Sequence, residues 1–194
     1  MKRVLITIAI LLGITLGAFA QNGTREGSMT YAPIVLPPHG DQEDQDASFV
    51  VVLALFQGWN WWSPTARVTA AQIRSILDTN LQEFKTKTGD VATDAVLMPG
   101  QMYKIKVNNT LYSERLAGLP SEASVSIGAG QNWIGFTDVA TTGISATLAT
   151  YGITPNNGDK ILSQDQGFAV YNGTSWEGTL TNLVPGKGYV YIRY

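Results

Sequence analysis

The chain has 194 residues, with 13 basic and 15 acidic side chains, a single histidine and no cysteine. Without cysteine it has no disulfide framework, no thiolate metal site and no lipoprotein anchor. The weakly negative net charge of −2 argues against nucleic acid and anionic lipid surfaces as partners. The length suits one domain, or two small ones, with enough chain to bury a hydrophobic core.

Residues 1–20 are predicted to be a secretory signal peptide. Lys2 and Arg3 precede an apolar run, and Ala18-Phe19-Ala20 places small residues at the two positions that signal peptidase reads. We predict cleavage before Gln21; an uncleaved membrane anchor is the alternative, but the run is short for a membrane span. Cleavage leaves 11 basic against 15 acidic side chains. The mature protein is then expected to be extracellular, on the cell surface or in the periplasm, with no membrane insertion.

Residues 21–46 are predicted to be a flexible arm. Prolines and glycines interrupt any periodicity, and residues 41–46 are a polar, acidic run, DQEDQD. The four acidic side chains of this run lack the glycine turn and the spacing of a calcium-binding loop. The single histidine, His39, lies in the arm, so no Ser-His-Asp arrangement is predicted.

The rest of the chain contains an internal repeat. GWNWWS at 58–63 corresponds to GQNWIG at 130–135, and LMPGQMYKI at 97–105 corresponds to LVPGKGYVY at 183–191. Two landmarks that recur in the same order predict two halves of similar structure. Residues 81–95 match no segment of the second half in a clear register. We define the two copies as repeat 1, residues 47–118, and repeat 2, residues 119–194.

Repeat 1 is predicted to begin with an apolar strand. Residues 50–56, VVVLALF, are a continuous β-prone run that is too short to span a membrane, so we expect a strand buried on both faces. A helix follows, with Thr69 as its N-cap. Ile73, Ile76 and Leu77 recur at helical spacing and form its apolar side.

Repeat 2 shows the same order with weaker signals. Val125-Ser126-Ile127 is the expected first strand, and residues 144–151 are the expected helix. Strands between 160 and 171 lead into Asn172-Gly173, a strong hairpin signal. Residues 189–194 alternate as a closing strand. The whole pattern predicts an α+β fold, mainly β, in which two strand–helix–strands units share one core.

Turn residues recur at equivalent positions of the two repeats. Asn60 and Asn132 follow glycines, and we expect their side chains to close a turn through hydrogen bonds to the backbone. Residues 185–188, PGKG, resemble a phosphate-binding loop. They recur at 99–102 as PGQM without the lysine, which favours a turn before a strand.

The motifs GWNWWS, GQNWIGF and the carboxyl-terminal GDKILSQDQGFAVYNGTSWEGTLTNLVPGKGYVYIRY together resemble a paired repeat module of secreted and surface proteins of Bacteroidetes bacteria. The resemblance covers residues 50–194 and is strongest over 158–194. It implies a module of long extracellular proteins described as adhesin-like or matrix-like, without assigned activity. It therefore transfers no catalytic residue.

The tryptophan cluster belongs either to the core or to a ligand-binding surface. On a strand, Trp59 and Trp61 share one face and Trp62 takes the other. Trp61 recurs as Trp133 in repeat 2, so we expect these two rings to be core. Trp62 corresponds to an isoleucine, which is also typical of core. Trp59 corresponds to Gln131, so we expect it to be partly exposed.

Trp176 is predicted to open a strand after the hairpin turn. Repeat 1 has no aromatic residue in the expected matching segment, Gly89-Asp90-Val91. We therefore expect Trp176 to be partly exposed and to form a contact patch with neighbouring tyrosines. The candidate ligand or partner contacts are Trp59, Tyr171, Trp176 and Tyr191.

No catalytic, cofactor-binding or metal-binding residue is predicted. Carboxylates such as Asp138, Asp159 and Asp165 could form a glycosidase pair, but they lie in no recognisable motif. We expect a secreted or surface, non-enzymatic module for adhesion, matrix or protein–protein assembly, with other surface proteins as partners. The alternative is a carbohydrate-binding module that stacks exposed rings on glycans. A sugar binder needs two or three rings on one open face, whereas a structural module hides them between the repeats.

Overall fold

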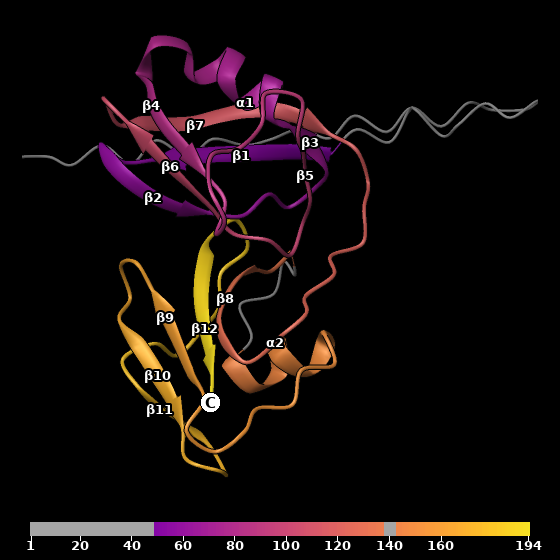
Figure 1. Cartoon of the computed structure of the whole chain (residues 1–194), viewed down its shortest axis with the longest axis vertical. Coiled ribbons are helices and arrows are strands. Elements are labelled where there is room, and N and C mark those ends of the chain that lie inside the picture. The colour runs from indigo at the N-terminus through magenta and orange to yellow at the C-terminus, as the bar shows by residue number, and fades with distance from the viewer. Residues whose placement is uncertain (1–48, 138–142) are drawn as a thin grey trace, which may run out of the picture. The chain divides into compact units, whose positions relative to one another are not determined.

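The computed structural model describes residues 49–137 and 143–194 (Figure 1). Within these residues the fold is mainly β, with two short α-helices and several antiparallel sheets, as expected from the sequence. The predicted signal peptide, the predicted arm with His39, and Asp138 lie outside the described residues.

Repeat 1 holds a three-stranded antiparallel sheet with the order β2-β6-β4, and two strand pairs, β1-β7 and β3-β5. Thr69 is the N-cap of α1, as predicted, and it forms a capping box with Gln72. The helix buries Ile73 and Leu77. The elements are β1 (Phe49–Leu55), β2 (Gly58–Trp62), β3 (Val68–Thr69), α1 (Ala70–Leu77), the 3₁₀ turn η1 (Asp78–Asn80), β4 (Leu81–Lys85), β5 (Val96–Leu97), β6 (Tyr103–Val107) and β7 (Leu111–Gly118).

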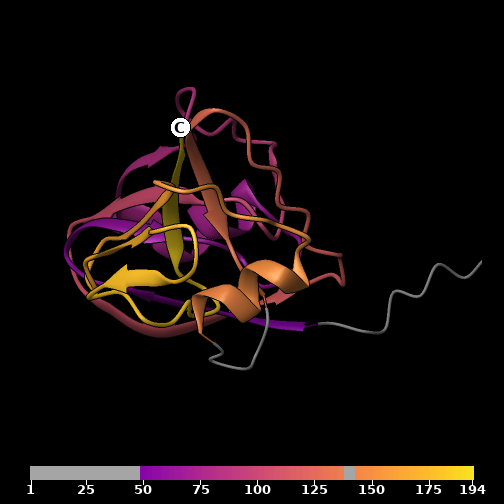
Figure 2. The same cartoon turned by 90° about the horizontal axis from the view of Figure 1, so that it is seen from below.

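Repeat 2 holds one five-stranded antiparallel sheet with the order β11-β10-β9-β12-β8. The helix α2 is the orange helix in Figure 2. It buries Ile144 and Leu148 in the core of this repeat. The hairpin predicted at Asn172-Gly173 joins β10 to β11. The elements are β8 (Gly130–Gly135), α2 (Ile144–Thr150), β9 (Lys160–Ser163), β10 (Phe168–Tyr171), β11 (Trp176–Gly178) and β12 (Gly188–Arg193).

The expected first strand of repeat 2 is wrong. Residues 125–127 are not a strand, although Val125 and Ile127 pack against the core of this repeat. In the described residues the segment has no partner comparable to β7, which pairs with β1 in repeat 1. The segment has an irregular backbone, and its apolar side chains are only partly buried.

The β1 strand is not buried on both faces, which corrects the expectation from its apolar run. Val51, Leu53 and Leu55 are buried, whereas Val50 and Val52, which alternate with them, are exposed. The strand covers the repeat 1 core with one face only, and no described element covers the other. An unbroken apolar run is therefore compatible with a half-exposed strand.

Sheet register supplies the alignment that the sequence leaves open. Phe84 of β4 pairs with Ile105, and Ile161 of β9 pairs with Tyr191. Because Ile105 and Tyr191 are equivalent in the repeat, β4 corresponds to β9. After β4, repeat 1 forms only a short pairing with this strand, through Val91. In repeat 2, the corresponding strand β9 pairs with β10, which continues into the β10-β11 hairpin.

Each repeat has its own hydrophobic core, so the prediction of one shared core is wrong. One cluster of buried side chains draws only on repeat 1, and a second draws only on repeat 2. The repeats meet instead through backbone hydrogen bonds and close packing. Met102 lies so near Gly188 that an added Cβ on this glycine would fall 2.1 Å from Met102 Cγ.

The contacts between the repeats obey a pseudo-twofold relation. The Ser63 amide donates to the Gly186 carbonyl at 3.2 Å, and the Gly135 amide donates to the Gly100 carbonyl at 3.1 Å. Ser63 is equivalent to Gly135, and Gly100 is equivalent to Gly186, so the two bonds exchange roles. The bridges Trp62–Lys187 and Gln101–Ile134 form a second such pair.

Asn60 and Asn132 close identical turns, which confirms the prediction for this pair. The Asn60 side chain accepts from the Phe56 amide at 2.8 Å and donates to the Phe56 carbonyl at 2.7 Å. Asn132 makes the same two bonds to Gly128, at 3.0 and 2.8 Å. Each turn thus uses one amide side chain in place of backbone pairing.

Candidate functional site

Strands β2 and β6 place two tryptophans directly opposite two lysines. Trp59 pairs with Lys106, and Trp61 pairs with Lys104, across the antiparallel ladder. Directly opposite residues share a face of the sheet. The intervening Asn60 is buried on the other face. The outer face of the repeat 1 sheet therefore alternates indole and ammonium groups.

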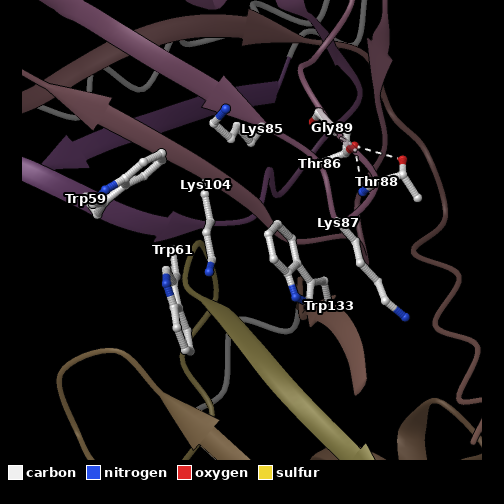
Figure 3. Close-up of a pocket in the computed structure, with 9 residues that line it drawn as sticks. All are labelled: Trp59, Trp61, Lys85, Thr86, Lys87, Thr88, Gly89, Lys104 and Trp133. Atoms are coloured by element: carbon white, nitrogen blue, oxygen red, sulfur yellow. Dashed lines mark hydrogen bonds between the residues drawn. The ribbon is translucent and has the colours of Figure 1, made fainter. Parts of the chain in front are cut away.

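Lys104 lies between tryptophans from both repeats. Its Nζ atom is 5.1 Å from the ring centroid of Trp61 and 4.5 Å from that of Trp133. Lys106 stands 5.7 Å from the Trp59 ring. All three distances lie within the range of cation–π attraction. Figure 3 shows the Lys104 side chain extended between Trp61 and Trp133.

These groups line an open pocket of about 570 Å³, the tryptophan pocket. Its walls come from the outer face of β2, β4 and β6, from the loop after β4, and from β8 of repeat 2 (Figure 3). No carboxylate is among the lining residues, which are Trp59, Trp61, Lys85, Thr86, Lys87, Thr88, Gly89, Lys104 and Trp133.

Ion pairs at the margin of the pocket compensate some of its lysines. Lys85 Nζ lies 3.2 Å from Glu83 and 3.1 Å from Asp90, and Lys106 Nζ lies 3.3 Å from Glu83. The hydrogen bond from Lys85, with that from Lys106, lowers the pKa of Glu83 despite some desolvation. The hydrogen bonds to Asp90 and Glu83 raise the pKa of Lys85. Glu83 and Lys85 are therefore both charged at neutral pH.

Trp61 and Trp133 are not core residues, which corrects the expectation from their recurrence. Both are half-buried and line the pocket. They recur because equivalent positions of the two repeats meet beside Lys104 at the pseudo-twofold contact. The buried members of the cluster are Trp62 and its counterpart Ile134. Trp59 is 37% exposed, as expected.

Trp176 is partly exposed, as expected, but the second predicted patch contains one buried ring. Tyr191 is fully buried, so the expectation that its ring stacks on a ligand is wrong. Trp176 is half-buried, with ring centroids 5.4 Å from Tyr171 and 6.2 Å from Tyr191, and its indole N–H is enclosed without an acceptor in the described residues. Trp59 lies in the other repeat, so the four predicted contacts do not form one site.

The lysines of the pocket were not predicted from the sequence. Lys104 and Lys106 flank the buried Ile105 at a period of two, which places them on one outer face. Repeat 2 has Val190 and Ile192 at the same positions. This replacement of two lysines by two apolar residues is the sequence signal that the outer face of repeat 1 differs from that of repeat 2.

Asp159, a candidate carboxylate, is fully buried, and its hydrogen bonds hold parts of the fold together. It accepts hydrogen bonds from the Tyr191 hydroxyl at 2.5 Å, the Asn156 amide at 2.9 Å and Arg193 at 3.3 Å. Burial alone would raise the pKa of Asp159, but these bonds together lower it. The carboxylate fastens the loop after α2 to the closing strand.

Asp165 pairs with Lys187. In the described residues, no group of three or more His, Asp or Glu side chains could hold a metal ion. No helix in the described part of the chain is long and apolar enough to cross a membrane. Comparisons with protein-family models, curated proteins and solved structures find no match for the chain.

Proposed function

We propose that the chain is an exported, non-enzymatic module that acts in adhesion or matrix assembly by binding carbohydrate at the tryptophan pocket. The observation that supports this function is the presence of three partly exposed rings, Trp59, Trp61 and Trp133, at one open pocket. Indole rings offer large, rigid apolar surfaces for the C–H faces of sugars, and nearby polar groups fix orientation.

The position of the rings favours binding over internal packing. The core is filled by Trp62 and by Ile134 of repeat 2, not by the pocket rings. Trp59 is replaced by Gln131 in repeat 2, where the same fold forms without it. A ring that the fold does not require, on an open face, supports a role in recognition.

Neighbouring polar groups also support a binding role rather than hydrolysis. The carboxylates beside the pocket, Glu83 and Asp90, are ion-paired with lysines. Thr86 and Thr88 place hydroxyls on the pocket wall, where they can bond to sugar hydroxyls. The resemblance to paired modules of Bacteroidetes surface proteins supports export and adhesion.

A glycan array with the purified chain tests the proposal. Trp59→Ala and Trp133→Ala should each weaken binding by about tenfold, the scale of one lost aromatic contact in a binding site. The matched control is Phe168→Ala, because Phe168 is 50% exposed but lies on β10 of repeat 2, outside the pocket. Equal binding by all three variants would reject the pocket as the carbohydrate site.

The exposed face of β1 favours protein–protein assembly as a second candidate function. Four apolar side chains are exposed at this strand and directly after it. In the described residues β1 pairs only with β7, so its other edge is open. Open apolar edges add strands from other chains. The four residues are Phe49, Val50, Val52 and Phe56.

Sedimentation of the purified chain over a concentration series tests this second function. The double substitution of Val50→Lys and Val52→Lys should abolish any concentration-dependent association, because two charges interrupt the apolar face. Replacement of Phe168 by Lys is the control for added charge on another exposed apolar side chain. Association that survives the double substitution would exclude the β1 face.

A further inference from the structure

We propose that the ligand of the tryptophan pocket is an acidic polysaccharide, with carboxylate or sulfate groups that contact Lys104 and Lys87. This inference rests on the proposed function, because it names the chemical class of the carbohydrate. It is carried by the charges of the pocket, which are independent of the exposed rings.

The first observation is a pair of like charges in which only one lysine has carboxylate partners. Lys104 and Lys85 are directly opposite each other in the β6-β4 ladder. Like charges at opposite positions destabilise a sheet. Lys85 is compensated by Glu83 and Asp90. Lys104 has no carboxylate within ion-pair distance anywhere in the described residues.

The second observation is the setting of the Lys104 ammonium. An ammonium has three N–H donors, and no described oxygen accepts a hydrogen bond from this one. The rings of Trp61 and Trp133 attract the charge but provide no lone pair. They also reduce its access to water on two sides. An anionic group that reaches Lys104 would form charge-assisted hydrogen bonds in a partly desolvated place.

The third observation is the sign of the whole face. Four lysines, at 85, 87, 104 and 106, stand against two carboxylates, Glu83 and Asp90. Lys87 donates to the Gln131 carbonyl of repeat 2 and has no carboxylate partner in the described residues. The local excess of positive charge occurs in a chain with more acidic than basic side chains. Such a face attracts anions.

Repeat 2 indicates that the fold does not require these cations. Equivalent positions hold Gln164 for Lys87, Val190 for Lys104 and Leu162 for Lys85, as the sheet registers define them. Gln164 keeps the bond to the other repeat, because its side chain donates to the Trp59 carbonyl. Glutamine is therefore sufficient for the contact between repeats. The positive charges are therefore specific to the tryptophan pocket and are not needed to hold the repeats together.

Rings interleaved with lysines also suit single-stranded nucleic acid. The polysaccharide is favoured because the chain carries a net charge of −2, and because one short cluster of lysines is not the continuous basic groove that tracks a phosphate backbone. We therefore assign the pocket to acidic sugars.

Titration calorimetry with matched hexasaccharides tests the assignment. The probes are a galacturonic acid hexamer and its fully methyl-esterified form, which has the same rings without charge. A sulfated hexasaccharide and its desulfated form separate the second source of anions. The variants are Lys104→Met and Lys87→Gln, with Lys160→Met as control. Lys160 also lies over an aromatic ring, 5.4 Å from Tyr194, but outside the pocket.

We expect one of the acidic hexamers to bind about tenfold more tightly than its neutral form, the scale of one charge-assisted hydrogen bond. Lys104→Met should remove this preference, Lys87→Gln should reduce it, and Lys160→Met should retain it. Equal binding of charged and neutral hexamers at the pocket would overturn the acidic ligand and leave the proposed function intact. Failure of every hexamer to bind would overturn both. Tighter binding of a single-stranded oligonucleotide of equal charge would overturn the ligand class.

Discussion

Ser63 and Gly135 occupy equivalent positions in the two repeats and lie against each other at the pseudo-twofold contact. A Cβ atom added to Gly135 would fall 1.9 Å from Ser63 Oγ and 2.2 Å from Ser63 Cβ. The two positions therefore hold one side chain between them. The two equivalent positions cannot both carry a side chain, so one of them has to be glycine.

Gly135→Ala should destabilise the chain by about 1–3 kcal/mol, because its methyl group overpacks the contact. Ser63 is fully buried and has little room to move. The double variant with Ser63→Gly and Gly135→Ala exchanges the two roles and should recover most of the loss. Urea titrations followed by circular dichroism measure this. A double variant less stable than Gly135→Ala would contradict the pseudo-twofold contact.

Ser63→Ala provides a control for the hydroxyl itself. Ser63 Oγ is buried and has no hydrogen-bond partner in the described residues. Its removal should leave stability unchanged or raise it by up to about 1 kcal/mol, because an unsatisfied buried polar group is unfavourable. A clear loss of stability would mean that the hydroxyl has a partner.

The tryptophans should differ sharply in their contribution to stability. Trp62 is 3% exposed and belongs to the repeat 1 core, so Trp62→Ala should cost about 3–5 kcal/mol. Trp133→Ala should cost clearly less, because this ring lines an open pocket. The same denaturant titrations compare the two. Equal losses would return Trp133 to a core role.

Trp176→Ala should be more destabilising than Trp133→Ala, the reverse of the order expected from the sequence. Trp176 packs against the repeat 2 core and contacts the rings of Tyr171 and Tyr191. Its removal leaves a space in that core. A smaller loss for Trp176→Ala, accompanied by weaker ligand binding, would restore the second contact patch.

Asn60→Asp and Asn132→Asp make a matched pair, because both residues form the same turn bonds. A carboxylate cannot donate to the carbonyls that the amide contacts. Asn60 is buried, whereas Asn132 is more exposed. We expect a loss of about 2–3 kcal/mol at Asn60 and about 1 kcal/mol at Asn132. Equal losses at both sites would show that burial does not matter to this turn.

Asp159 should make stability depend on acid pH. Its pKa is lowered from the ordinary 3.8 in the folded chain. Its contribution is therefore complete above about pH 4 and is lost as the pH falls through the folded value. Asp159→Asn should cost about 3 kcal/mol at pH 7, the scale of lost charge-assisted bonds. The difference between wild type and variant should shrink below pH 4; a difference that grows there would contradict the lowered pKa.

Local signals in the sequence were sufficient for much of the fold. The repeated landmarks predicted two similar halves, Thr69 predicted the start of α1, and Asn172-Gly173 predicted the β10-β11 hairpin. Each of these depends on a few neighbouring residues. The register of residues 81–95 depended on pairing with β6, which no local pattern contains.

The errors concern which face of an element is covered, and this depends on distant parts of the chain. The apolar run of β1 gives no indication that one face lacks a covering layer. Recurrence of Trp61 as Trp133 indicated equivalence correctly, but two equivalent residues can meet at a symmetry contact as well as fill two cores. The sequence does not identify Lys104 as a site residue, because its neighbour Trp133 lies 29 positions away.

The most direct test of the tryptophan pocket is an NMR titration of the five indole N–H signals, one for each tryptophan in the chain. Substitution of each tryptophan by phenylalanine assigns the signals. Addition of the acidic hexasaccharide should shift the signals of Trp59, Trp61 and Trp133, which line the pocket, and leave those of the buried Trp62 and of Trp176 unchanged. Shifts confined to Trp176, or no shift in any indole at saturating hexasaccharide, would contradict the account.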